Sequence, residues 1–159
     1  MKTTVQALAP LFLFLALILG SCSDECDDVN CQNGGRCDDG DCICLDGFVG
    51  NECQSEMRAP FLGAYSVNEN CEGGNDTFQM TITTSNTGVR NIILVFPGLN
   101  VAAEVNGASM TIPNQTINVQ NTALSISGTG QLTGNILTMS YTLGAGGGST
   151  SCSATCTKL

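Results

Sequence analysis

Residues 26–53 read CDDVNCQNGGRCDDGDCICLDGFVGNEC, a stretch with six cysteines and few large apolar side chains. Those apolar side chains are Val29, Ile43, Leu45, Phe48 and Val49. So small a set cannot offset the entropy that is lost when the chain becomes ordered. A disulfide adds roughly 2–4 kcal/mol of stability. We therefore expect a small module that is cross-linked by three disulfides and formed in an oxidising compartment.

The cysteines of this stretch are spaced C-x4-C-x5-C-x4-C-x-C-x8-C, and six cysteines alone can pair in many ways. The spacing, with Asn33-Gly34-Gly35 before the third cysteine and Gly47-Phe48-Val49-Gly50 before the sixth, resembles the EGF-like family. The resemblance implies protein–protein contact as the role of the module. It also implies the disulfides Cys26–Cys37, Cys31–Cys42 and Cys44–Cys53.

Acidic residues near this module raise the question of calcium, which prefers several oxygen ligands. Asp24 and Glu25 partly match the acidic stretch that precedes the first cysteine of calcium-binding EGF-like modules, and Asp38 offers a further carboxylate. The aromatic residue that such modules carry between the third and fourth cysteines is absent. We interpret the three carboxylates as a solvated acidic surface, and we expect no metal and no other cofactor.

The residues before the module are typical of an export signal. Lys2 precedes an apolar run from Leu8 to Leu19, which is shorter than the ~20 residues of a membrane span. Its length and its charged start fit the core of a signal peptide.

Leu19-Gly20-Ser21-Cys22 resembles the lipobox of bacterial lipoproteins, whose cysteine is acylated and becomes the first mature residue. The resemblance implies a signal peptide at 1–21, a lipid on Cys22 and a short anchored start at 22–25. The acidic pair at 24–25 resembles the surface-export tag of Bacteroidota lipoproteins. The location that follows is the outer membrane or cell surface. The alternative is a secreted protein in which Cys22 is a spare thiol.

After a predicted linker at 54–60, the composition changes to one rich in Thr, Ser, Asn, Val and Ile, which favour strands. Apolar and polar residues alternate, for example from Phe78 to Ile82 and from Leu137 to Leu143. Asn106-Gly107 predicts a tight hairpin turn. About eight such strands predict a mostly β protein with an antiparallel β-barrel or β-sandwich over 61–159.

The opening of this β domain, Phe61-Leu62-Gly63-Ala64-Tyr65, resembles that of lipocalin-like barrels. The domain as a whole is similar to the small C-terminal β domains of Bacteroidota surface lipoproteins. Both resemblances concern architecture, and fold alone does not determine function.

Three cysteines remain in the β domain: Cys71, Cys152 and Cys156. Cys71 falls in a predicted polar turn at 68–74. Cys152 and Cys156 lie four residues apart on one face of a predicted strand, roughly 13 Å from each other, which is beyond disulfide reach. One of them should therefore bridge to Cys71. We favour Cys71–Cys152, which leaves Cys156 as a buried free thiol, while a bridge to Cys156 stays open.

The chain contains no histidine, which excludes Ser-His-Asp and Cys-His catalysis and histidine metal sites. Glu69, Glu72 and Asp76 cluster along one predicted loop, and we interpret them as part of a solvated turn. Glu104 is expected on the outer face of a strand. We therefore expect no enzyme.

The formal net charge is -9, and ten of the 14 acidic residues lie between Asp24 and Glu56. Without a basic patch, nucleic acid is not expected as a partner. The sequence thus predicts a lipid-anchored cell-surface protein that binds, without catalysis, a protein or glycan on the extracellular side. The alternative is a carrier of apolar small molecules with a lipocalin-like cavity. The side chains that would line that cavity are Met80, Met110, Met139, Phe78 and Phe96. The other interpretation, commoner in a barrel of this size, is that they simply fill the core.

Overall fold

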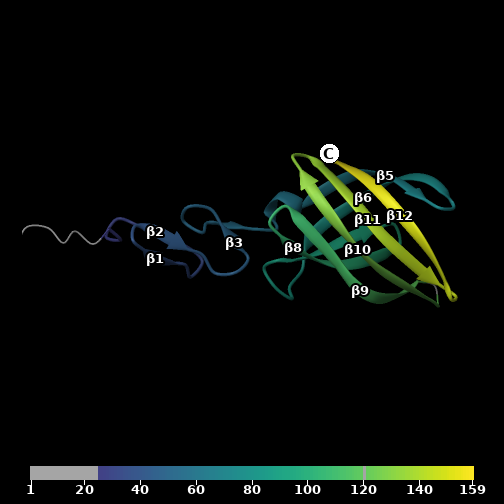
Figure 1. Cartoon of the computed structure of the whole chain (residues 1–159), viewed down its shortest axis with the longest axis horizontal. Coiled ribbons are helices and arrows are strands. Elements are labelled where there is room, and N and C mark those ends of the chain that lie inside the picture. Colours follow the sequence, from purple (N-terminus) through teal and green to yellow (C-terminus); the bar gives the residue numbers. More distant parts are fainter. Residues whose placement is uncertain (1–24, 120) are drawn as a thin grey trace, which may run out of the picture.

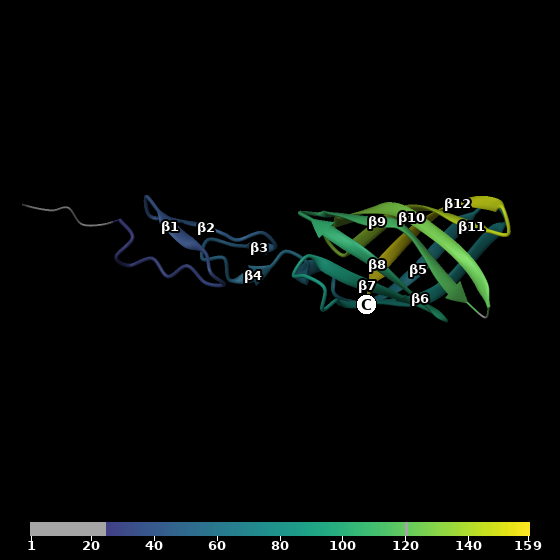
Figure 2. The same ribbon diagram turned by 90° about the horizontal axis from the view of Figure 1, so that it is seen from below.

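The computed structural model describes residues 25–119 and 121–159, and strands make up nearly all of its regular structure (Figure 1). A disulfide-rich region, residues 25–53, and a β-barrel lie end to end along the long axis of the molecule (Figures 1 and 2). The predicted signal peptide, Cys22 and Asp24 lie outside the described residues. Among the described residues, no helix is long and apolar enough to span a membrane.

The disulfide-rich region contains little regular structure. Strand β1 (Arg36–Asp38) pairs with β2 (Asp41–Ile43), and β3 (Phe48–Val49) pairs with β4 (Ser55–Glu56), both antiparallel. Asp39 and Gly40 form the turn between β1 and β2, and both have positive φ. This backbone geometry matches the twist of a two-residue hairpin.

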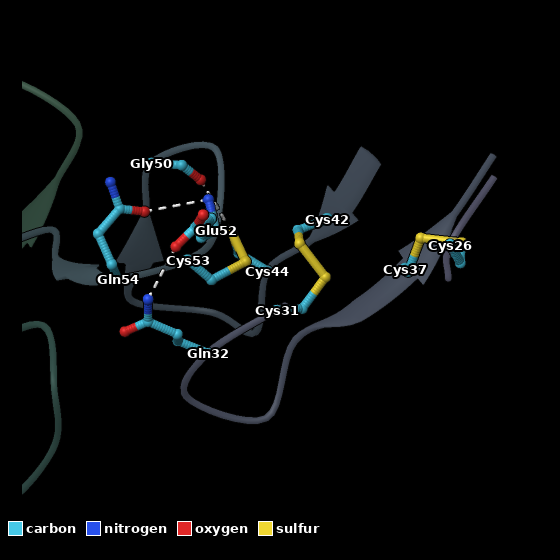
Figure 3. The surroundings of a disulfide bond; sticks show 10 residues. All are labelled: Cys26, Cys31, Gln32, Cys37, Cys42, Cys44, Gly50, Glu52, Cys53 and Gln54. Atoms are coloured by element: carbon cyan, nitrogen blue, oxygen red, sulfur yellow. Dashed lines mark hydrogen bonds between the residues drawn. A yellow bond between two sulfur atoms is a disulfide. The ribbon is translucent and has the colours of Figure 1, made fainter. Parts of the chain in front are cut away.

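Three disulfides hold this region together: Cys26–Cys37, Cys31–Cys42 and Cys44–Cys53 (Figure 3). They are the same pairs that the EGF-like resemblance implies. Cys53 is fully buried, whereas Ile43 and Leu45 are about half exposed. The side chain of Gln32 donates a 2.9 Å hydrogen bond to Glu52 beside the third disulfide. The cross-links therefore take the place of an apolar core here.

The rest of the described chain forms a closed antiparallel barrel of eight strands, each paired with its neighbours in sequence. The strands are β5 (Gly63–Cys71), β6 (Gly74–Thr84), β7 (Asn91–Phe96), β8 (Leu99–Asn106), β9 (Ser109–Val119), β10 (Thr122–Thr133), β11 (Ile136–Ala145) and β12 (Gly148–Lys158). The pairing of β12 with β5 closes the barrel. The prediction of a mostly β fold is confirmed, and the architecture is a barrel rather than a sandwich.

The barrel has two unlike ends. The attachment end carries the loop 85–90 and the turns 107–108 and 134–135, and it faces the disulfide-rich region (Figure 1). The distal end carries the turns 72–73, 97–98 and 146–147. At the attachment end, the 3-10 helix η1 (Ala59–Phe61) places Phe61 in the barrel with no exposed surface. The buried Tyr65 hydroxyl donates a 2.9 Å hydrogen bond to the Phe61 carbonyl. This bond fixes the positions of Phe61 and Tyr65, which together form an aromatic plug.

Strands β8 and β9 are joined by backbone pairing over only part of their length. Their pairing is confined to the three residue pairs from Glu104↔Thr111 to Asn106↔Ser109. Beyond it lies Pro113, which has no N–H to donate. The side-chain amide of Gln115 instead bonds the N–H and the carbonyl of Ala102, at 3.1 and 2.7 Å. One side chain thus replaces the missing strand contact.

The segment 54–60, predicted as a linker, consists largely of ordered structure: it contains β4 and most of η1. The Arg58 side chain is buried against the loop 85–90 at the attachment end. Its Nη1 atom donates to the carbonyls of Ser85, Gly88 and Asn91 at 2.7–2.9 Å, and its Nε pairs with Glu56.

A second contact joins Gly47 of the disulfide-rich region to the loop at 85–90. A Cβ atom at position 47 would lie 2.2 Å from the Val89 side chain, so only glycine fits, and its φ is +90°. Beside it, Arg90 pairs with Asp46 at 3.2 Å. These contacts place Asp46 and Gly47 against the loop 85–90 of the barrel.

Two turns differ from the sequence-based expectation. The β8–β9 hairpin turns at Gly107-Ala108 rather than at Asn106-Gly107, because Asn106 still pairs with Ser109. Cys71 is the last residue of β5 and not part of a turn, since β5 and β6 pair as far as Cys71↔Gly74. Only Glu72 and Gly73 form that turn.

Candidate functional site

A cavity of about 370 Å³ opens at the distal end of the barrel. Its position follows from strand alternation, which turns every second side chain inward. At the attachment end these inward side chains fill the barrel, and at the distal end they line an open space. The lining residues are Glu69, Asp76, Phe78, Phe96, Pro97, Leu99, Leu124, Ile126, Tyr141 and Leu143.

The polar part of the cavity consists of two carboxylates and a phenol. Glu69 on β5 and Asp76 on β6 are directly opposite each other across the strand pair. The Tyr141 hydroxyl on β11 donates a hydrogen bond to the Glu69 carboxylate. Burial, and then the neighbouring Asp76 carboxylate, raises the pKa of Glu69 above its ordinary value.

Gly128 allows Tyr141 to take this position. The two residues are cross-strand partners in β10 and β11, next to a bulge between Ile126 and Gly128. A Cβ atom at position 128 would lie 2.5 Å from the Ser140 carbonyl oxygen and 2.7 Å from the Tyr141 Cα. Any side chain here would therefore push β11 outward and move the phenol.

The remaining lining is mostly apolar. The rings of Phe78 and Phe96 lie with their centroids 6.0 Å apart and tilted by 55°. These two residues line the cavity as the carrier alternative predicts. Met80, Met110 and Met139 do not line it: they are at most 3 % exposed and fill the packed core, as the commoner interpretation expects. The cavity is therefore confined to the distal part of the barrel.

The rim of this end is cross-linked by Cys71–Cys152, the bridge that the sequence favoured, between residues 81 positions apart. The Cys71 and Cys152 sulfurs lie within 4.8 Å of a Glu69 carboxylate oxygen. This grouping is not a metal site, because the two sulfurs are bonded to each other and offer no thiolate.

Cys156 is a buried free thiol, as expected once Cys152 pairs with Cys71. Burial, and then Glu69, raises the pKa of Cys156 to about 12. The thiol therefore stays protonated near neutral pH and is a poor nucleophile.

The calcium candidates do not form a group of three ligands within the described part of the chain. Asp38 lies 3.6 Å from its near neighbour Arg36 and is largely exposed, as is Glu25. The third candidate, Asp24, lies outside the described residues.

The acidic residues of the barrel are not one solvated turn. Glu72 is exposed in the β5–β6 turn and Asp76 is an exposed residue of β6 at the cavity, but Glu69 is a half-buried strand residue that faces the cavity. Its place could have been found by extending the inward parity of Tyr65 and Val67 by one step. Glu104 points outward as expected, where it pairs with Arg90.

Comparisons of the chain with protein-family models, with curated proteins and with solved structures found no match.

Proposed function

We propose that this protein is a lipid-anchored cell-surface protein that acts by non-catalytic binding, with residues 26–53 as an EGF-like spacer and contact module. The observation that carries the proposal is the arrangement of the two regions. Arg58 fastens the segment 54–60 to one end of the barrel, Asp46 and Gly47 of the disulfide-rich region contact the same end, and the cavity opens at the other end. A barrel anchored through the N-terminal side would hold its open end outward (Figure 1).

The anchor itself is supported by the sequence. A signal-peptide pattern at 1–21 ends at Cys22, and the four disulfides account for eight of the ten cysteines. Cys156 is the buried thiol within the barrel, which leaves Cys22 as the remaining cysteine for acylation. The short start at 22–25 then connects the lipid to the spacer. A few acyl chains suffice for stable anchoring.

A binding role without catalysis is supported by the chemistry that the chain offers. It has no histidine, and its free thiol in the barrel is protonated near neutral pH. The partner that fits an outward-facing barrel and an EGF-like module is a protein or glycan outside the cell. The negative charge of the chain disfavours nucleic acid.

A second candidate is a small-molecule carrier, and the distal cavity favours it. Its volume, about 370 Å³, falls in the ordinary range for ligand pockets, roughly 300–1,000 Å³. Its lining is mainly apolar with a few convergent polar groups, as such pockets usually are. Carriage and surface anchoring are compatible, since they use opposite ends of the molecule.

The anchoring proposal is tested by the intact mass of the protein purified from the membrane fraction of its native cells, unfolded and with free thiols alkylated. The expected mass is that of residues 22–159 with acyl groups and one alkylated cysteine, Cys156. A Cys22→Ala variant serves as the control and should carry no acyl mass. An unacylated wild-type protein found in the medium would contradict the proposal.

A further inference from the structure

The distal cavity contains more hydrogen-bond acceptors than donors. Tyr141 has a single hydroxyl proton, and it is donated to Glu69. The Asp76 carboxylate accepts the backbone N–H of Thr77 at 2.7 Å and has further lone pairs. The described residues that line the cavity include no Lys or Arg. Asp76 is exposed to solvent, so water can reach its carboxylate, but the lining supplies no positive charge to balance the two carboxylates. A cationic ligand with hydrogen-bond donors would supply that charge.

The apolar part of the lining indicates the chemistry of the remainder of the ligand. Phe78 and Phe96 form an aromatic wall, and Leu124, Ile126 and Leu143 supply aliphatic surface. A small, fully hydrated cation would leave this apolar surface uncovered. An anionic amphiphile would bring its charge against two carboxylates, which is unfavourable. An apolar body joined to a cationic donor satisfies both parts of the lining.

We propose that the distal cavity binds a small amphipathic amine, with its protonated amino group between Glu69 and Asp76 and its apolar body against Phe78 and Phe96. The proposal rests on the carrier role described above and names the ligand class for it. Tyr141 is a positioning residue, since its hydrogen bond fixes the Glu69 carboxylate beside Asp76. The aromatic rings also favour a nearby cation.

Isothermal titration calorimetry tests the inference with three probes of equal chain length: octylammonium, octanol and octanoate. The sample is the mature chain with Cys22→Ala, which lacks the proposed anchor and keeps every described residue. The expected result is one saturable site, with octylammonium bound most tightly and octanoate least tightly. Octanol or octanoate binding as tightly as octylammonium would overturn the inference while leaving the carrier role intact.

Glu69→Gln and Asp76→Asn remove one charge each with little change of shape. Each should weaken octylammonium binding by about tenfold or more, because the charge-assisted hydrogen bond is lost, and should weaken binding of the neutral octanol far less. Glu72→Gln is the matched control, since it removes the same charge at the same end but outside the lining. An unchanged octylammonium affinity in both cavity variants would overturn the inference.

The three probes distinguish a failure of the amine inference from a failure of the carrier role. Absence of saturable binding by all three probes would overturn both the amine inference and the carrier role. It would leave the anchoring proposal untouched, because that proposal is decided by the intact mass. Near-UV circular dichroism of each variant shows whether its barrel remains folded.

Discussion

The two ends of the barrel are built from the same strands and the same alternation, yet one is filled and the other is open. At the attachment end, Phe61 and Tyr65 are fully buried and joined by a hydrogen bond. At the distal end, the inward positions of β5 and β6 carry the carboxylates of Glu69 and Asp76. The difference shows how one barrel can have a packed core at one end and an open cavity at the other.

The largest effect on stability is expected from the aromatic plug. Phe61→Ala removes a side chain with no exposed surface, and such truncations cost roughly 3–5 kcal/mol. Phe78→Ala at the distal end is the matched truncation, and its loss should be clearly smaller because Phe78 is only partly buried. Urea denaturation of the two variants measures both losses. Equal losses would show that the two ends do not differ in packing.

The next largest effect concerns the joint between the regions. Arg58→Ala should lower the free energy of unfolding by about 2–3 kcal/mol, since it leaves the buried Ser85 carbonyl and two partly buried carbonyls without a charged donor. Arg36→Ala is the control, because Arg36 belongs to an exposed pair that is worth about 0–1 kcal/mol. The same denaturation experiment compares them. If both variants lost the same small amount of unfolding free energy, the hydrogen bonds of Arg58 would not stabilise the joint.

The smallest effect on stability is expected from a substitution of Glu69. Unlike the two truncations, this substitution should stabilise the folded protein. Because the pKa of Glu69 is raised in the folded protein, the protonated form favours folding. That stabilisation is complete below about pH 4.5 and is lost as the pH rises through the raised value. Glu69→Gln resembles the protonated form, so its melting temperature should exceed that of the wild type at pH 7 and approach it at pH 4.

Differential scanning calorimetry at the two pH values measures this difference in melting temperature between Glu69→Gln and the wild type, with Glu72→Gln as the exposed control. A gap for Glu69→Gln that does not change between pH 7 and pH 4 would show that burial of the carboxylate is not its cause.

The sequence predicted the fold where simple patterns are strong. Alternation over Phe78–Ile82 and Leu137–Leu143 indicated strands, and the structure has β6 and β11 there. The choice between barrel and sandwich stayed open, because it depends on the pairing of β5 with β12, which are far apart in sequence; the favoured Cys71–Cys152 bridge joins these two strands. The bridging role of Gln115 could not be predicted, because it needs the chain path on both sides of Pro113.

The sequence predicted part of the apolar lining of the candidate site but not its polar groups. Phe78 and Phe96 were expected in a cavity, since apolar inward residues are easy to recognise. Glu69 was assigned to a solvated turn because polar neighbours hide the parity of β5. Tyr141 reaches Glu69 from β11, 72 positions later in the chain, and no local pattern encodes such a contact.

The proposal assigns ligand binding to the distal end of the barrel, whereas the attachment end is a packed core. Methyl NMR spectra recorded during titration with octylammonium distinguish the two ends. We expect the largest shift changes at Leu124, Ile126 and Leu143, and none beyond error at the buried Ile82, Ile92 and Leu137. Shift changes concentrated at the attachment end, or spread over the outside of the barrel, would contradict it.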